Sequence, residues 1–179
     1  MLKPHPSPLR LSATALAQRT INTLSTAEQF LISALRLWFR AHGEDGACCC
    51  RSLLRNGFQA AGLLATEFEA FDRALTLIHA GHVGGVWIEP LHEPVISHGE
   101  LRYLRILTCC QHDQVAQARR ALAVWLPPAA VRIALPHLQH FAQACAHVNL
   151  TLTPGGLEAV SEESRPVVIA LRAPSARLH

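Results

Sequence analysis

Ser25-Thr26-Ala27-Glu28 and Ser97-His98-Gly99-Glu100 both have the spacing of a helical capping box. In such a box the serine side chain accepts a hydrogen bond from the amide three residues later, and the glutamate accepts one from the serine amide. Each box is followed by apolar residues at steps of three and four, a pattern typical of an amphipathic helix. The sequence therefore predicts two consecutive groups of helices and an all-α fold.

The two groups together predict a single-domain bundle of five to seven helices over residues 25–150. In the first group, residues 25–81, apolar stripes and glycine stops predict helices over residues 26–41, 47–61 and 64–81. In the second group, residues 97–149, we expect a helix over 98–111, one capped by Asp113 and ending near 126, and one from Pro136 to Asn149. The linker, residues 82–96, has too many glycines and prolines for a regular helix.

Both ends of the chain differ from this helical region. Residues 1–24 carry basic residues and no acidic ones, and we expect a flexible basic leader rather than a targeting signal. Residues 151–179 are expected to form an extended or partly disordered tail, in which Pro166–Leu171 has the β-branched content of a strand. No apolar run reaches the roughly 18 residues of a membrane span, so we expect no membrane insertion and a cytoplasmic, bacterial protein.

The leading interpretation of function is a small helical adaptor or regulatory protein that binds a protein segment or a small ligand without catalysis. The chain contains no nucleotide-binding, serine-hydrolase or EF-hand motif. The expected binding groove lies between the two groups, near the linker, and its candidate residues are Trp87, His92, Trp38 and Trp125. The expected partner is another protein or a second copy of this chain.

The alternative is a protein that binds a metal ion or haem through histidines, although no cofactor is predicted outright. The candidate ligands are His79, His82, His137, His140 and His147, because imidazoles three residues apart on a helix can share one ion. The plainer interpretation is a polar helix flank that uses histidine where other proteins use glutamine or lysine.

Among the six cysteines, Cys109 is a candidate reactive thiol. On a helix it lies on the side of Arg102 and Arg105, whose charges would favour the thiolate. Cys50, Cys110 and Cys145 fall on apolar stripes and are predicted to be small buried side chains.

A third interpretation is a DNA-binding regulator. Residues 51–63 follow a glycine turn and resemble the second element of a helix-turn-helix, with Arg51, Arg55 and Gln59 as candidate contacts. Three such side chains are few, so nucleic acid is an unlikely partner. Five arginines between Arg102 and Arg132, against Asp113 as the only acid before Glu158, are compatible with an acidic partner. The plainer interpretation is a solvated face whose basic residues are mostly arginine.

Overall fold

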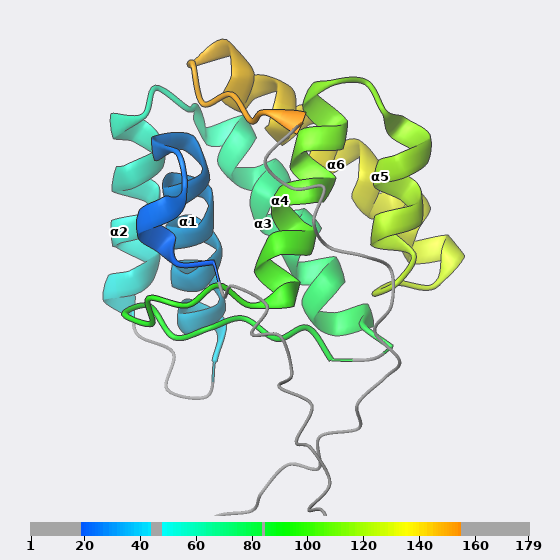
Figure 1. Ribbon diagram of the computed structural model, residues 1–179, viewed down its shortest axis with the longest axis horizontal. Helices are drawn as coiled ribbons and strands as arrows, with labels where there is room; N and C mark the ends of the chain where they lie inside the picture. Colours follow the sequence, from blue (N-terminus) through cyan, green and yellow to red (C-terminus); the bar gives the residue numbers. More distant parts are fainter. Residues whose placement is uncertain (1–18, 44–47, 84, 155–179) are drawn as a thin grey trace, which may run out of the picture.

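The computed structural model describes residues 19–43, 48–83 and 85–154, which form six α-helices and no β-strand (Figure 1). The all-α prediction is confirmed. The helices are α1 (Thr26–His42), α2 (Cys48–Ala60), α3 (Ala65–Gly81), α4 (His98–Gln111), α5 (Val115–Leu122) and α6 (Pro128–His147). The predictions for residues 1–18 and 155–179, including the segment Pro166–Leu171, lie outside the described residues. No helix in the described ranges is long and apolar enough to cross a membrane.

The most extensive helix interface joins α3 to α6, and so connects the two groups predicted from the capping boxes. α1 packs on α2, and α4 packs on both α5 and α6. Three phenylalanine rings from α2, α3 and α6 meet in the core: the centroid of Phe71 lies 5.0 Å from that of Phe58 and 5.1 Å from that of Phe141. The linker crosses one end of this bundle (green in Figure 1).

Both predicted capping boxes are present. The Ser25 amide donates to Glu28 Oε2 at 2.8 Å and the Glu28 amide donates to Ser25 Oγ at 3.3 Å. The corresponding distances in the second box, between Ser97 and Glu100, are 2.8 and 3.1 Å. Each box satisfies two backbone donors that the first turn of a helix leaves without partners.

Asp113 has a different role from the predicted one. It does not cap α5; it ends α4, with a left-handed φ of 56°. The amide of Gln114 donates to the carbonyl oxygen of Cys109 at 2.8 Å, which is the long hydrogen bond of a Schellman stop. Asn149 ends α6 in the same way, with a φ of 64°, as its position after the apolar stripe predicted. Aspartate and asparagine adopt this conformation more readily than other side chains that carry a Cβ.

The last helix also begins earlier than predicted. α6 starts at Pro128, in the first turn, where proline loses no hydrogen bond, and it continues through Pro136. An internal proline removes a bond to the carbonyl four residues before it. The buried stripe of Val131, Leu135 and Leu138 runs across this position, so packing against the core holds the helix together.

Residues 19–24, which were expected to belong to the flexible leader, lie against the linker. Thr20 forms an isolated antiparallel bridge with Val95. The Ile21 amide donates to the Pro94 carbonyl at 2.8 Å, and the buried side chain of Leu24 packs into the core.

Candidate functional site

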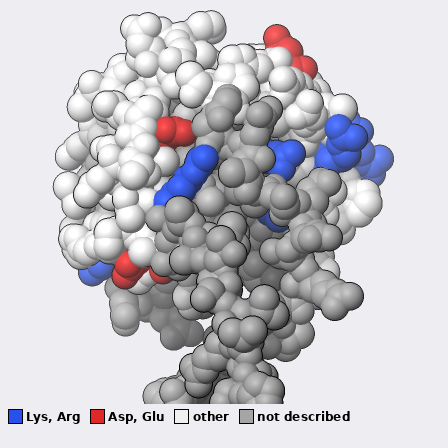
Figure 2. Space-filling view, viewed as in Figure 1, with Lys and Arg blue, Asp and Glu red and all other residues white. Residues whose placement is uncertain are grey.

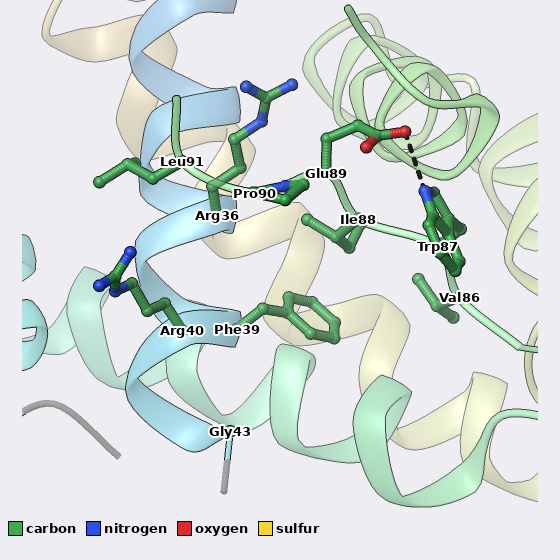
Figure 3. A pocket seen from close by; sticks show the side chains of 10 residues that line it. All are labelled: Arg36, Phe39, Arg40, Gly43, Val86, Trp87, Ile88, Glu89, Pro90 and Leu91. Carbon is green, nitrogen blue, oxygen red and sulfur yellow. Dashed lines mark hydrogen bonds between the residues drawn. The ribbon is translucent and has the colours of Figure 1, made fainter. Parts of the chain in front are cut away.

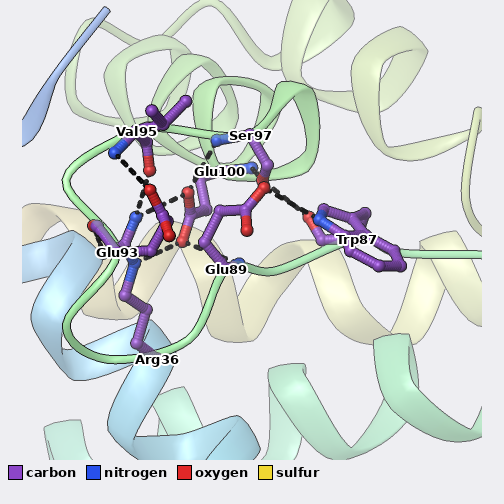
Figure 4. A network of polar contacts seen from close by, with 7 residues as sticks. All are labelled: Arg36, Trp87, Glu89, Glu93, Val95, Ser97 and Glu100. Carbon is purple, nitrogen blue, oxygen red and sulfur yellow. Dashed lines mark hydrogen bonds and ion pairs between the residues drawn. The ribbon is translucent and has the colours of Figure 1, made fainter.

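The linker is held in place by Arg36 of α1. Its guanidinium forms a two-pronged ion pair with Glu100, with Nε 2.6 Å from Oε1 and Nη2 3.1 Å from Oε2. The remaining donors reach the carbonyl oxygens of Glu93 and Val95 in the linker (Figure 4). Both side chains of the ion pair are fully buried. The second capping box therefore fixes the start of α4 and also anchors the linker, because Glu100 serves both purposes.

The linker also passes directly over the start of α4. Ser97 Oγ donates to the Trp87 carbonyl oxygen at 2.7 Å. A side chain at Gly99 would collide with that same carbonyl group. Glycine is therefore required inside this box so that the linker backbone can lie against the helix.

Between the linker and the C-terminal half of α1 lies a groove of about 540 Å³ (Figure 3). Its walls are mostly apolar, with two charged ends. Arg40 and Leu91 lie at the opposite end from Trp87 and Glu89, whose side chains are joined by a 2.8 Å hydrogen bond. The lining residues are Arg36, Phe39, Arg40, Gly43, Val86, Trp87, Ile88, Glu89, Pro90 and Leu91.

The backbone of residues 86–89 has one bonded side and one open side. The Trp87 carbonyl and the Glu89 amide, which donates to Glu100 Oε1 at 3.3 Å, both face α4. Val86 and Ile88 alternate with these two residues along the linker, and no hydrogen bond joins their backbone groups to α4. Within the described residues, neither of these two makes a backbone hydrogen bond. This open side resembles the edge of a sheet that lacks a neighbour.

Only one of the four residues predicted for the groove lines it. Trp87 does so with 64% of its surface exposed, whereas His92 is exposed just beyond the lining. Trp38 and Trp125 are corrected to core residues, since they are 1% and 5% exposed. The Trp38 indole donates to Asp72 Oδ1 at 2.8 Å, as a buried indole N–H requires.

The predicted metal ligands are not brought together. His140 lies 3.5 Å from Glu67 near the start of α3, whereas His79 near its end packs against the ring of Phe39. Twelve residues of helix separate Glu67 from His79, which is about 18 Å. His82 follows the end of α3, and His137 and His147 lie on α6 on either side of His140 in the sequence. None of the three completes a metal site with His79 or His140. No group of three histidine, cysteine, aspartate or glutamate residues in the described ranges could hold a metal ion.

The expectation of a reactive Cys109 is also corrected. The thiol is buried, and burial raises its pKa, an effect that the nearby Arg105 only partly offsets. Removal from water disfavours the thiolate more than one partly exposed guanidinium favours it. Cys50, Cys110 and Cys145 are buried, as their positions on apolar stripes predicted.

The candidate DNA contacts lie on α2 and are exposed. Two of the three have partners on α3: Arg51 lies 4.0 Å from Asp72, and Arg55 lies over the ring of Phe68 at 5.2 Å. Gln59 makes no such contact in the described residues.

Sequence reasoning missed the residues that build the groove, above all Arg36. A signal was available, because Arg36 follows Ile32 by four residues and therefore continues a buried face of α1. A charged side chain at such a position requires a buried partner. Glu100 was noticed only as a helix cap.

Comparison with known proteins assigns the chain to no group. No family model, curated protein or solved structure matches it.

Proposed function

We propose that this protein is a non-catalytic binding module, and that its groove takes a short extended peptide segment from a partner protein. The observation that carries the proposal is the open backbone edge at Val86 and Ile88, beside an apolar groove. Extended peptides bind such edges as an added strand, with main-chain hydrogen bonds giving affinity and side-chain pockets giving specificity. The volume of about 540 Å³ falls within the range of ordinary ligand sites.

The chemistry of the lining indicates what the segment carries. Phe39, Ile88 and Leu91 favour apolar side chains. Arg40 has no carboxylate partner among the described residues, so we expect an acidic residue at that end of the bound peptide. The lining contains no serine, cysteine or histidine, which supports binding rather than covalent catalysis. The free thiols among the described residues are consistent with a reducing, cytoplasmic location.

An array of immobilised octapeptides with random apolar and acidic positions tests this proposal. We expect the full-length protein to select a defined set, and Trp87→Ala to weaken binding of that set at least tenfold. Leu64→Ala is the matched control, because Leu64 is 69% exposed and does not line the groove. Equal binding by the two variants, or no selected set, would overturn the proposal.

Two further measurements separate the parts of the proposal. Two versions of a selected peptide are methylated on the odd-numbered or on the even-numbered backbone nitrogens. One version should lose binding and the other should keep it, because only every second amide of an added strand pairs with the edge. Arg40→Gln should remove the preference for an acidic residue while retaining apolar selection. Selection that depends on protein self-association would instead assign the groove to a second copy of this chain.

A further inference from the structure

A second surface, separate from the groove, lies where α4 packs on α5. A turn of three residues joins these helices, so they run antiparallel, and Cys109 Sγ lies 3.9 Å from Gln117 Oε1 between them. Arg105 is one turn before Cys109, and Arg120 is one turn after Gln117. In an antiparallel pair these two steps lead in the same direction along the helices, so Arg105 and Arg120 lie at a similar level of the α4–α5 pair. We call these two residues the arginine face.

The arginine face has a local excess of positive charge. Within the described residues, neither Arg105 nor Arg120 forms an ion pair. Asp113 is the only acidic residue between positions 101 and 154. Figure 2 shows basic side chains gathered on the side of the molecule that carries α5. Guanidinium groups held close together repel one another, so an anion bound among them is favoured.

The chain leaves the described region close to this surface. Leu152 is buried and tied to the end of α4, where its amide donates to Gln111 Oε1 at 2.8 Å and its carbonyl lies 2.9 Å from His112 Nε2. Six helical residues separate Gln111 from Arg105, which is about 9 Å. From Pro154, four residues to Glu158 span up to about 13 Å and nine to Glu163 up to about 30 Å. The next acidic residues of the chain are therefore within reach of the arginine face.

We propose that the acidic stretch Glu158–Glu163 of this same chain binds the arginine face. The stretch contains Glu158, Glu162 and Glu163, and these supply the charge that the face lacks. Exposed ion pairs are individually weak, so a separate acidic molecule would need a high concentration to bind. A short tether raises the effective concentration of the stretch to the millimolar range, which favours the intramolecular partner. The face accepts another polyanion only when this stretch is displaced.

Nuclear magnetic resonance of the full-length protein tests this proposal. We expect the amide shifts of residues 158–163 to differ from those of a free peptide of residues 155–179 at about 20 mM salt. At about 500 mM salt they should converge on the peptide values, because ion pairs at the surface are screened. Agreement with the peptide values already at low salt would overturn the proposal.

Substitutions then identify the contact. In the double variant Arg105→Glu with Arg120→Glu, the amide shifts of residues 158–163 should equal those of the free peptide at low salt. Adding Glu158→Arg and Glu162→Arg to that variant should make these shifts differ from the peptide values again. Arg55→Glu on α2, a single reversal of exposed charge away from this face, should change nothing. If the Arg105→Glu, Arg120→Glu variant loses its helical circular dichroism signal, the milder variant Arg105→Gln with Arg120→Gln is measured in its place. Shifts that vary with protein concentration would show binding to a second copy and overturn the intramolecular assignment.

Discussion

Arg36 donates from all three of its guanidinium nitrogens, to Glu100 and to two carbonyl oxygens of the linker. Moving two charges out of water costs several kcal/mol for each ion. Here the paired geometry and the additional hydrogen bonds offset that cost. The main effect of the ion pair is therefore to fix the position of the linker. Its net contribution to the free energy of unfolding is small.

Removing the arginine alone should be far more costly than removing a surface arginine. Arg36→Met leaves the Glu100 carboxylate buried without its counter-ion, and we expect a loss of about 3–5 kcal/mol in the free energy of unfolding. Arg73→Met, which breaks an exposed pair with Glu69, should cost less than about 1 kcal/mol. Urea unfolding measures both values. Similar losses in the two variants would contradict this role for Arg36.

The buried thiols predict how stability depends on pH. Burial raises the pKa of Cys110 and of Cys145 from 9.0 to about 12. Below pH 9 these thiols are neutral in both states, so they give no pH dependence. Above pH 9 they ionise only in the unfolded chain, which lowers stability by about 1.4 kcal/mol per pH unit for each thiol. Urea midpoints at pH 8, 9 and 10 test this, and Cys145→Ala should reduce the slope; a flat profile would count against it.

At the scale of single elements, the start of α4 is the most constrained position. Gly99→Ala places a Cβ against the Trp87 carbonyl, so the linker has to move away from Ser97. We expect a loss of about 1–3 kcal/mol from overpacking, together with a change in Trp87 fluorescence. Gly57→Ala is the matched control, since open space surrounds that position in α2, and it should stabilise the protein by about 0.5–1 kcal/mol. A loss of stability in Gly57→Ala as large as that in Gly99→Ala would show that the close approach of the Trp87 carbonyl does not decide the result.

The helices could be predicted from the sequence because their signals are local. Capping boxes, glycine stops and apolar stripes each involve residues within a few turns of one another. Asp113 was misassigned because aspartate is common both at the start and at the end of a helix, whereas Pro136 was expected in the first turn of a helix and lies inside α6. Asp113 resembled a cap but adopts the left-handed conformation that ends α4. Only packing by the rest of the chain decides between such roles.

At the scale of the whole molecule, α3 and α6 unite the two groups into one core. The ring centroids of Phe71 and Phe141 lie 5.1 Å apart across this junction. We therefore expect both groups to unfold in a single transition. Variants that retain only Trp38 or only Trp125 report on the first and second group, and their urea midpoints should coincide. Separate midpoints would mean that the groups are independent units.

The groove lies beside the linker, but between the linker and α1 rather than between the two groups of helices, and only Trp87 of the four expected residues lines it. The broken helical pattern of the linker and Trp87 located it, because those signals are local. Arg36 and Glu100 are 64 positions apart, and no helical pattern relates such distant residues. The histidines failed as a set for the same reason, since their spacing on each helix said nothing about how α3 and α6 are placed relative to each other.

The polar contacts that hold the linker are made largely by its main chain, while Ile96, Val86 and Ile88 pack against the core. Arg36 binds the carbonyls of Glu93 and Val95, Ser97 binds that of Trp87, and Glu100 accepts from the amide of Glu89. Main-chain atoms are the same whatever side chain a residue carries. The exposed side chains of this wall are thus free to diverge during evolution, or to be exchanged by design, while the scaffold beneath them stays constant. New peptide preferences are accessible here without refolding the bundle, as in binding proteins whose variable loops are carried on a fixed framework.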